Sequence, residues 1–305
     1  MKRPVIASLF GSAPVAMAMD FASALLAEDI PTTPRTEAVG EAGGMVASSS
    51  ERFTVQRGVA VVPVRGLLTF NSFILERYLG WTTYAGLVET FNELARNPDV
   101  TGVVIEGDSP GGLVTGLDAA GQAIAACAKL KPVHALVNPL AASAAYWLIS
   151  QARDITMTPG SVVGSVGIAL NASTPVQPGS NGEQAYLLTS SNARAKRPDP
   201  ATDEGRAELQ RSLDEAEARF HAAVSAGRNI PIADLTTRLS VTDDPRDGGA
   251  TFAPGDAIAR GLADQAETRA AFYDRILGTY APQPRKVASR GYAARAAAAM
   301  ASAAL

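Results

Sequence analysis

Two short segments of this chain carry residue types suited to nucleophilic attack on an acyl bond. Ser109-Pro110-Gly111-Gly112 follows the apolar run Val103-Val104-Ile105. Ala141-Ala142-Ser143-Ala144-Ala145 places a single hydroxyl among alanines. A Gly-Gly turn after a buried strand can direct backbone N–H groups toward an oxyanion, and a serine at a strand-to-helix junction can be a nucleophile. Together the two segments predict a serine hydrolase.

Ser143 is the candidate nucleophile because we expect it where a strand gives way to a helix. The free N–H groups and the dipole of a helix N-terminus favour developing negative charge. The backbone N–H of Ala144 is then a natural oxyanion donor. The alternative is a structural role, since a buried serine without further support is usually a small packed residue or a helix cap.

Gly111 and Gly112 are the candidate partners of Ser143 in oxyanion or substrate binding. A backbone without Cβ lets a substrate approach closely and presents an N–H to it. Losing one oxyanion donor typically costs about 10²–10³-fold in rate. An ordinary turn is the alternative, and the presence of Ser143 in the same chain makes the oxyanion interpretation more specific.

The general base is harder to identify. The two histidines, His134 in an expected strand and His221 in a charged helix, do not fall at recognisable triad positions. Lys196 lies in a loop beyond the next strand, between Arg194 and Arg197, and a serine–lysine dyad would need it neutral at rest. The alternative for Lys196 is a solvated surface cation.

Composition narrows the classes of function. The chain has 305 residues, of which 47% are hydrophobic, and a net charge of −3, which suits a sizeable core and argues against a nucleic-acid surface. The single cysteine, Cys127, excludes an intramolecular disulfide, and no metal-ligand spacing is present, so we expect no metal and no cofactor. No apolar run reaches about 18 residues, so no membrane span is predicted.

Periodicity places these residues in an α/β fold. Strands are predicted at residues 59–64, ending at Arg65-Gly66, and at 101–106, 132–137, 155–157 and 186–189. Helices are predicted at 83–96, 114–129, 143–152 and 203–226, the last capped by Thr202. Because strands alternate with helices, we expect a largely parallel sheet. The predicted divisions are an N-terminal arm and linker (1–52), a compact domain (53–280) and a flexible alanine-rich, basic tail (281–305).

Six segments in order resemble the signal peptide peptidase A (protease IV) family of serine peptidases, and more closely its branch of tailed-phage head maturation, or capsid, proteases. They are Asp108-Ser109-Pro110-Gly111-Gly112, Ala142-Ser143-Ala144-Ala145-Tyr146, Gly164-Ser165-Val166-Gly167, Lys196-Arg197-Pro198-Asp199-Pro200, Ala226-Gly227-Arg228 and Gly261-Leu262-Ala263-Asp264. The resemblance covers residues 58–264, most of the expected compact domain.

The resemblance implies a Clp protease/crotonase-like fold of repeated ββα units. It also implies a Ser143 nucleophile, a Lys196 base and oxyanion contacts at Gly111 or Gly112 and Ala144. The expected substrates are capsid or scaffold proteins, in the bacterial host cytoplasm or procapsid, and the expected assembly is a homo-oligomeric ring. The loop at Lys196 lacks the Ser-Gly-x-x-Lys spacing of cellular members.

Three rival functions remain open at this stage. A cellular signal peptide peptidase-like protease would share the dyad but would be expected to carry an N-terminal membrane segment. A crotonase-type acyl-CoA enzyme would use the same oxyanion donors without a nucleophile, which leaves Ser143 unexplained. An inactive Clp-like ring would serve as an assembly scaffold without proteolysis.

Overall fold

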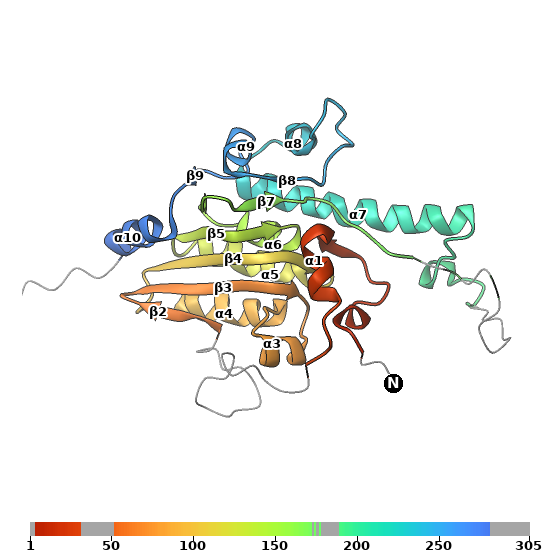
Figure 1. Ribbon diagram of the computed structural model, residues 1–305, viewed down its shortest axis with the longest axis horizontal. Coiled ribbons are helices and arrows are strands. Elements are labelled where there is room, and N and C mark those ends of the chain that lie inside the picture. The colour runs from red at the N-terminus through yellow and green to blue at the C-terminus, as the bar shows by residue number, and fades with distance from the viewer. Residues whose placement is uncertain (1–3, 32–51, 173, 175–176, 178–188, 281–305) are drawn as a thin grey trace, which may run out of the picture.

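The fold is built on one mixed sheet, seen in a computed structural model that describes residues 4–31, 52–172, 174, 177 and 189–280 (Figure 1). The main path of the sheet runs β2-β3-β4-β5-β6-β9, with β1 beside β4 and with β7 joining β5 to β8. The strands are β1 (Val15–Met17), β2 (Thr54–Gln56), β3 (Val59–Leu68), β4 (Gly102–Leu113), β5 (Val133–Ala142), β6 (Asp154–Met157), β7 (Val162–Gly164), β8 (Thr251–Phe252) and β9 (Gln265–Ala266). The predicted strand 186–189, the linker at 40–50 and the tail 281–305 lie outside the described residues.

Helices cover the sheet and extend beyond it. They are α1 (Met19–Leu26), α3 (Phe73–Leu79), α4 (Tyr84–Arg96), α5 (Leu117–Ala128), α6 (Ala144–Ile149), α7 (Asp203–Arg228), α8 (Ile232–Leu239), α9 (Pro254–Ala259) and α10 (Arg269–Tyr280), with 3-10 turns η1 (Ile6–Leu9) and η2 (Arg194–Lys196). In the described part of the chain, no helix combines the length and apolarity that crossing a membrane requires.

The central strands are parallel, which confirms the α/β class. β3, β4, β5 and β6 pair in parallel with α4, α5 and α6 between them in the sequence. β5 serves two neighbours in turn: His134 to Val137 pair with β6, and Leu140 to Ala142 pair with β7. β5 therefore pairs with two different strands along its length, β6 in its first half and β7 in its second.

Local signals predicted the helices well. α4 begins after Thr83, whose hydroxyl accepts a hydrogen bond of 3.2 Å from the Gly86 amide, and Leu87, Phe91 and Leu94 are buried on one face. Thr202 caps α7 in the same way, accepting from the Gly205 amide at 3.0 Å. Such caps satisfy amides that have no acceptor within the helix.

The strand ends were predicted wrongly. β3 does not stop at Arg65-Gly66 but continues to Leu68, and β4 does not end in a turn at Gly111-Gly112 but runs through both glycines to Leu113. The glycines are paired with β3 and with β1. A Cβ on Gly112 would collide with the Leu68 carbonyl oxygen, so glycine here allows close strand packing instead of a turn.

The main core lies between the sheet and helices α4, α5 and α6, and one half of α7 packs onto it. Phe220 of α7 stacks on Trp147 of α6 with ring centroids 4.9 Å apart. Phe220 and Val224 are fully buried, whereas residues 203–215 of the same helix are mostly exposed. The N-terminal half of α7 therefore projects away from the sheet (Figure 1).

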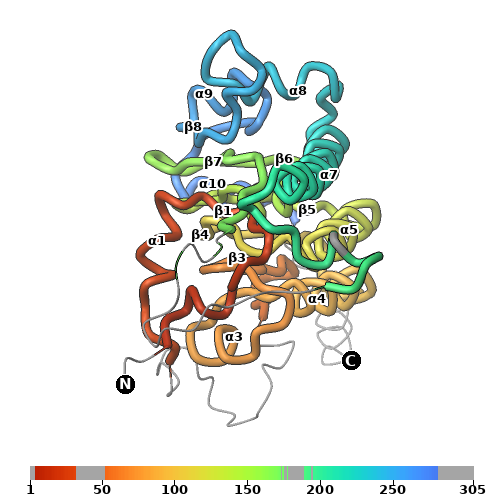
Figure 2. Tube along the Cα trace, turned by 90° about the vertical axis from the view of Figure 1, so that its right-hand side faces the viewer, coloured from red at the N-terminus to blue at the C-terminus, as the bar shows by residue number. Residues whose placement is uncertain are grey.

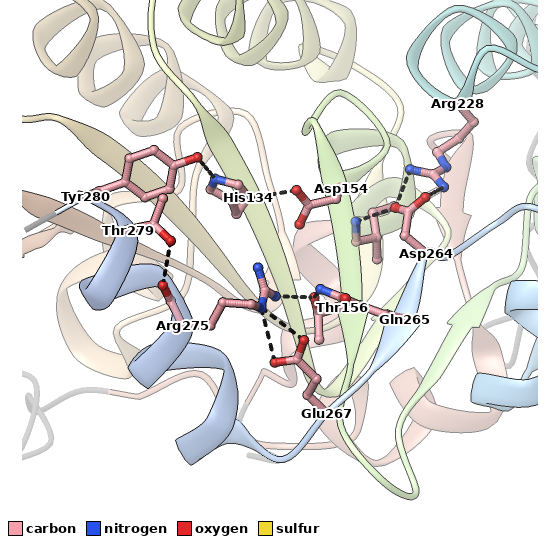
Figure 3. A network of polar contacts seen from close by, with 11 residues as sticks. His134, Asp154, Thr156, Arg228, Asp264, Gln265, Glu267, Arg275, Thr279 and Tyr280 are labelled. Atoms are coloured by element: carbon pink, nitrogen blue, oxygen red, sulfur yellow. Dashed lines mark hydrogen bonds and ion pairs between the residues drawn. The ribbon is translucent and has the colours of Figure 1, made fainter.

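Polar contacts tie the C-terminal elements to the other end of the sheet (Figure 3). His134 of β5 bonds Asp154 through Nδ1 at 2.7 Å and the Tyr280 hydroxyl through Nε2 at 2.9 Å. Arg228 and Asp264 form a two-pronged ion pair at 2.8 and 3.0 Å. The His134 contacts fasten α10 to the sheet, and the Arg228–Asp264 pair fastens the end of α7.

Candidate active site

Ser143 occupies the sharp junction between β5 and α6, as the alanine-rich segment predicted. Its backbone has φ 54° and ψ −120°, a conformation that a residue with a side chain rarely adopts. The Ser143 amide donates to the Gly164 carbonyl at 2.7 Å, and its carbonyl accepts from the Trp147 amide at 3.0 Å. Strain of this kind costs about 1–3 kcal/mol and persists where the surrounding structure enforces it, often at functional sites.

The Ser143 hydroxyl is buried and unpaired. The residue is 1% exposed, and none of the described residues offers Oγ a hydrogen bond. A buried hydroxyl without a partner costs free energy, so it indicates a group held for chemistry or for a missing partner. Among the residues that the structure describes, no base makes a hydrogen bond to Oγ.

Gly111 and Gly112 face different neighbours. The Gly111 amide donates to Ser109 Oγ at 3.1 Å, and Ser109 Oγ in turn donates to the Gly66 carbonyl at 2.6 Å. The amides of alternate residues of a strand point the same way. The Pro110 carbonyl accepts from the Ala18 amide, and the Val114 amide donates to the Pro14 carbonyl. The Gly112 amide lies between these two positions on the same edge of β4, so it also points toward β1.

Ala144 lies against the glycine strand, as an oxyanion donor must. A Cβ on Gly111, whose φ is +106°, would stand 3.0 Å from the Ala144 amide nitrogen and would collide with the Ala16 carbonyl oxygen. Ala144 is the first residue of α6, so its amide has no acceptor within the helix. The Ala144 amide nitrogen and the Ala16 carbonyl oxygen therefore both lie close to Gly111, next to Ser143.

Lys196 makes no hydrogen bond to the Ser143 hydroxyl. It is exposed, on η2, and precedes the projecting N-terminal half of α7 (Figure 1). α7 has 26 residues and is about 39 Å long at about 1.5 Å per residue. Only the far half of that helix packs near α6, so Lys196 as the base stays a prediction.

Neither histidine replaces it. His134 is near the start of β5 and Ser143 follows its end, so a ten-residue strand, about 30 Å at about 3.3 Å per residue, separates them. His134 is also fully engaged with Asp154 and Tyr280. His221 lines a cavity of about 550 Å³ with Met17, Ser165 and Glu217. Burial lowers the pKa of His221, partly offset by the Glu217 carboxylate, but His221 makes no hydrogen bond to Ser143 Oγ, which has no partner among the described residues.

Two features of the site were missed from sequence. Ser109 orients the glycine strand through the contacts above; its place just before Pro110-Gly111-Gly112 was the available signal. The second is β1, from the expected arm, which pairs with the two glycines. Its three residues, Val15-Ala16-Met17, are too short a run for any strand pattern to emerge.

Comparison with known proteins places this arrangement in context. The family model for peptidase family S49 matches residues 125–277. Capsid assembly protease C of Escherichia phage lambda is 30% identical over 219 residues, which is 70% of this chain and 47% of that protein. Head-tail preconnector protein GP5 of Enterobacteria phage P21 is 31% identical over 150 residues, 46% of this chain and 30% of that protein. The chain thus spans less than half the length of either relative.

Among solved structures, the ClpP protease catalytic domain from Plasmodium falciparum is similar at 12% identity and a TM-score of 0.41. That match covers 68% of this chain and 86% of the other.

Proposed function

The chain belongs to peptidase family S49, and on that basis we propose that it is a serine endopeptidase with Ser143 as nucleophile and Lys196 as general base. The observation that carries the proposal is the Ser143 junction. A strained serine with a buried, unpaired hydroxyl adjoins a glycine strand and the first amide of α6. Within the described residues, no group makes a hydrogen bond to that hydroxyl.

The proposed reaction uses these groups in order. Ser143 Oγ attacks the scissile carbonyl carbon, and neutral Lys196 accepts the hydroxyl proton. The carbonyl oxygen becomes an oxyanion between the amides of Gly112 and Ala144; Gly112 is preferred over Gly111 because the Gly111 amide is bonded to Ser109. As the C–N bond breaks, the lysine returns the proton to the leaving amine, and water later releases the acyl group.

For substrates we propose phage capsid or scaffold proteins during head assembly, within the host cytoplasm or the procapsid. The support is the similarity to capsid assembly protease C and to head-tail preconnector protein GP5. We also propose a homo-oligomeric ring as the working assembly.

The test compares wild type with Ser143→Ala and Lys196→Ala, incubated with labelled casein and with purified phage capsid and scaffold proteins, and reads products by intact mass. We expect cleavage by wild type and loss of at least about 10³-fold in either variant. Ser165→Ala and Arg197→Ala are the matched controls and should retain activity. Cleavage by Ser143→Ala at the wild-type rate would refute the nucleophile, and survival of cleavage in Lys196→Ala would refute the base.

A further inference from the structure

β1 fills a slot between two other stretches of backbone. Its first edge pairs antiparallel with β4, in the register Val15↔Leu113, Ala16↔Gly112 and Met17↔Gly111. On the second edge, Val15 and Ala169 exchange two hydrogen bonds of 2.9 Å each. A slot that bonds an extended segment along both edges is the geometry by which proteins bind a peptide strand.

The slot passes directly over the predicted nucleophile. Ala18 shares a small buried cluster with Leu140 and Ala142, and its amide donates to the Pro110 carbonyl at 2.8 Å. The Ala16 carbonyl oxygen reaches the same point beside Gly111 as the Ala144 amide. β1 and Ala18 therefore lie against the segment that holds Ser143, which is 1% exposed, and a second peptide strand cannot pair with Gly111 to Leu113 while β1 does.

The segment that carries β1 is stabilised mainly by its own hydrogen bonds and by an apolar cluster separate from the main core. Residues 4–30 close on themselves, through the Ile6 amide to the Glu28 carbonyl at 2.8 Å and the Ile30 amide to the Pro4 carbonyl at 2.9 Å. Four of their apolar side chains, Ile6, Phe10, Met17 and Ala22, form a cluster separate from the main core with Leu67, Leu75 and Trp81. Figure 2 shows this segment, in red, running beside β3 and β4. Of β1, only Ala16 belongs to the main core.

We propose that β1 is an autoinhibitory strand, which must leave the slot before Ser143 is accessible to a protein substrate. The inference rests on the proposed function, since the slot is a substrate channel only if Ser143 is the nucleophile. The replacing substrate would be an extended segment with a small residue at the place of Ala16, because that residue is enclosed by the core. Where an open form is populated to about 10% or less, releasing the strand raises apparent affinity about tenfold or more.

A reversible lock tests the proposal in the full chain. The double variant Val15→Cys with Ala169→Cys allows a disulfide between β1 and the opposite edge of the slot. Residues that exchange both backbone hydrogen bonds have Cα atoms about 5.5 Å apart, which is within the range for a disulfide. In a Ser143→Ala background, binding of a fluorescent peptide with the sequence of residues 12–20 is measured by anisotropy. We expect oxidation to weaken binding at least about tenfold and reduction to restore it. Val15→Cys alone, which retains Cys127, controls for other thiol chemistry.

Release is tested by a second pair of variants. Phe10→Ala removes a ring that is 7% exposed in the cluster holding the segment, whereas Leu9→Ala truncates a neighbour that is 41% exposed. We expect Phe10→Ala to raise peptide binding, and casein cleavage in the Ser143 chain, at least about tenfold, with no change for Leu9→Ala.

The outcomes separate the inference from the function it rests on. Equal peptide binding by the oxidised, reduced and Phe10→Ala proteins would overturn the autoinhibitory strand, whatever the proteolytic activity. Increased binding on release without any cleavage would support the blocked slot and refute the peptidase. Increased binding together with increased cleavage supports both.

Discussion

At the residue scale, the site depends on a serine whose backbone and side chain are both unfavourable for stability. Ser143 has a positive φ, and its buried Oγ has no partner among the described residues. Ser109, also fully buried, does the opposite: its hydroxyl makes two hydrogen bonds, one of them to the Gly111 amide. The two buried serines therefore differ in hydrogen bonding, as expected if Ser143 is the proposed nucleophile and Ser109 orients the glycine strand.

We predict that Ser143→Ala raises the free energy of unfolding by about 1 kcal/mol, because the variant removes an unsatisfied buried hydroxyl. Ser109→Ala should lower it by about 1–2 kcal/mol, since it leaves the Gly66 carbonyl and the Gly111 amide unpaired. Urea denaturation followed by circular dichroism measures both. If both variants lowered the free energy of unfolding by the same amount, the predicted difference between Ser143 and Ser109 would be wrong.

At the element scale, α10 is fastened to the sheet by a charged cluster on β4. Glu106, 6% exposed, accepts from Arg269 at 2.6 and 3.1 Å and from the Tyr273 hydroxyl at 2.8 Å. Burial by itself raises the pKa of Glu106, but hydrogen bonds from Arg269, Tyr273 and Asn138 outweigh it, so its pKa is lower than usual. The charged form is therefore the one that the fold stabilises.

We predict that this cluster makes stability fall in acid. A carboxylate with a lowered pKa contributes stability above its ordinary pKa, and this contribution is lost as the pH falls through the lowered value. Glu106→Gln should cost about 1–3 kcal/mol at pH 7 and flatten the loss of unfolding free energy below about pH 4.5. Glu89→Gln, in an exposed ion pair with Arg52, should cost less than about 1 kcal/mol. Urea titrations at pH 3.5 to 7 test this, and an unchanged acid slope in Glu106→Gln would contradict it.

Element boundaries also explain where sequence reasoning succeeded. α4 and α7 were predicted because caps at Thr83 and Thr202 and the spacing of buried residues are local properties. The extension of β4 through Gly111-Gly112 was missed because Gly-Gly is locally a turn signal. Only pairing with β3 on one side and β1 on the other keeps the glycines extended.

At the scale of the whole molecule, the proposed dyad requires Lys196 to reach Ser143, and the two side chains make no hydrogen bond to each other in this structure. Lys196 is exposed before the projecting half of α7, while Ser143 lies under the sheet end. For the proposed ring, we predict that Lys196 acts on Ser143 of a neighbouring subunit, because it is exposed and precedes a projecting helix. The predicted dyad would then form between two copies of the chain.

We predict that Ser143→Ala and Lys196→Ala, each inactive alone, regain activity when they are mixed, unfolded and reassembled. For a ring with random placement, about a quarter of the sites then receive an intact Ser143 and an intact Lys196, provided that the two residues come from different subunits. Casein cleavage by the mixture, with each variant reassembled alone as control, measures this. No recovery in mixed assemblies of native size would show that both residues act within one chain.

The sequence by itself determined the α/β class, most of the core helices and the junction serine, because periodicity, caps and the strand-to-helix change are encoded locally. It also indicated the family, since six ordered segments persist where overall identity is low. Tertiary structure decided that the glycines are strand residues, that the Gly111 amide is occupied by Ser109, and that His134 is far from Ser143. It also placed Val15-Ala16-Met17 across the site. These outcomes depend on contacts between residues distant in the chain, which no local pattern records.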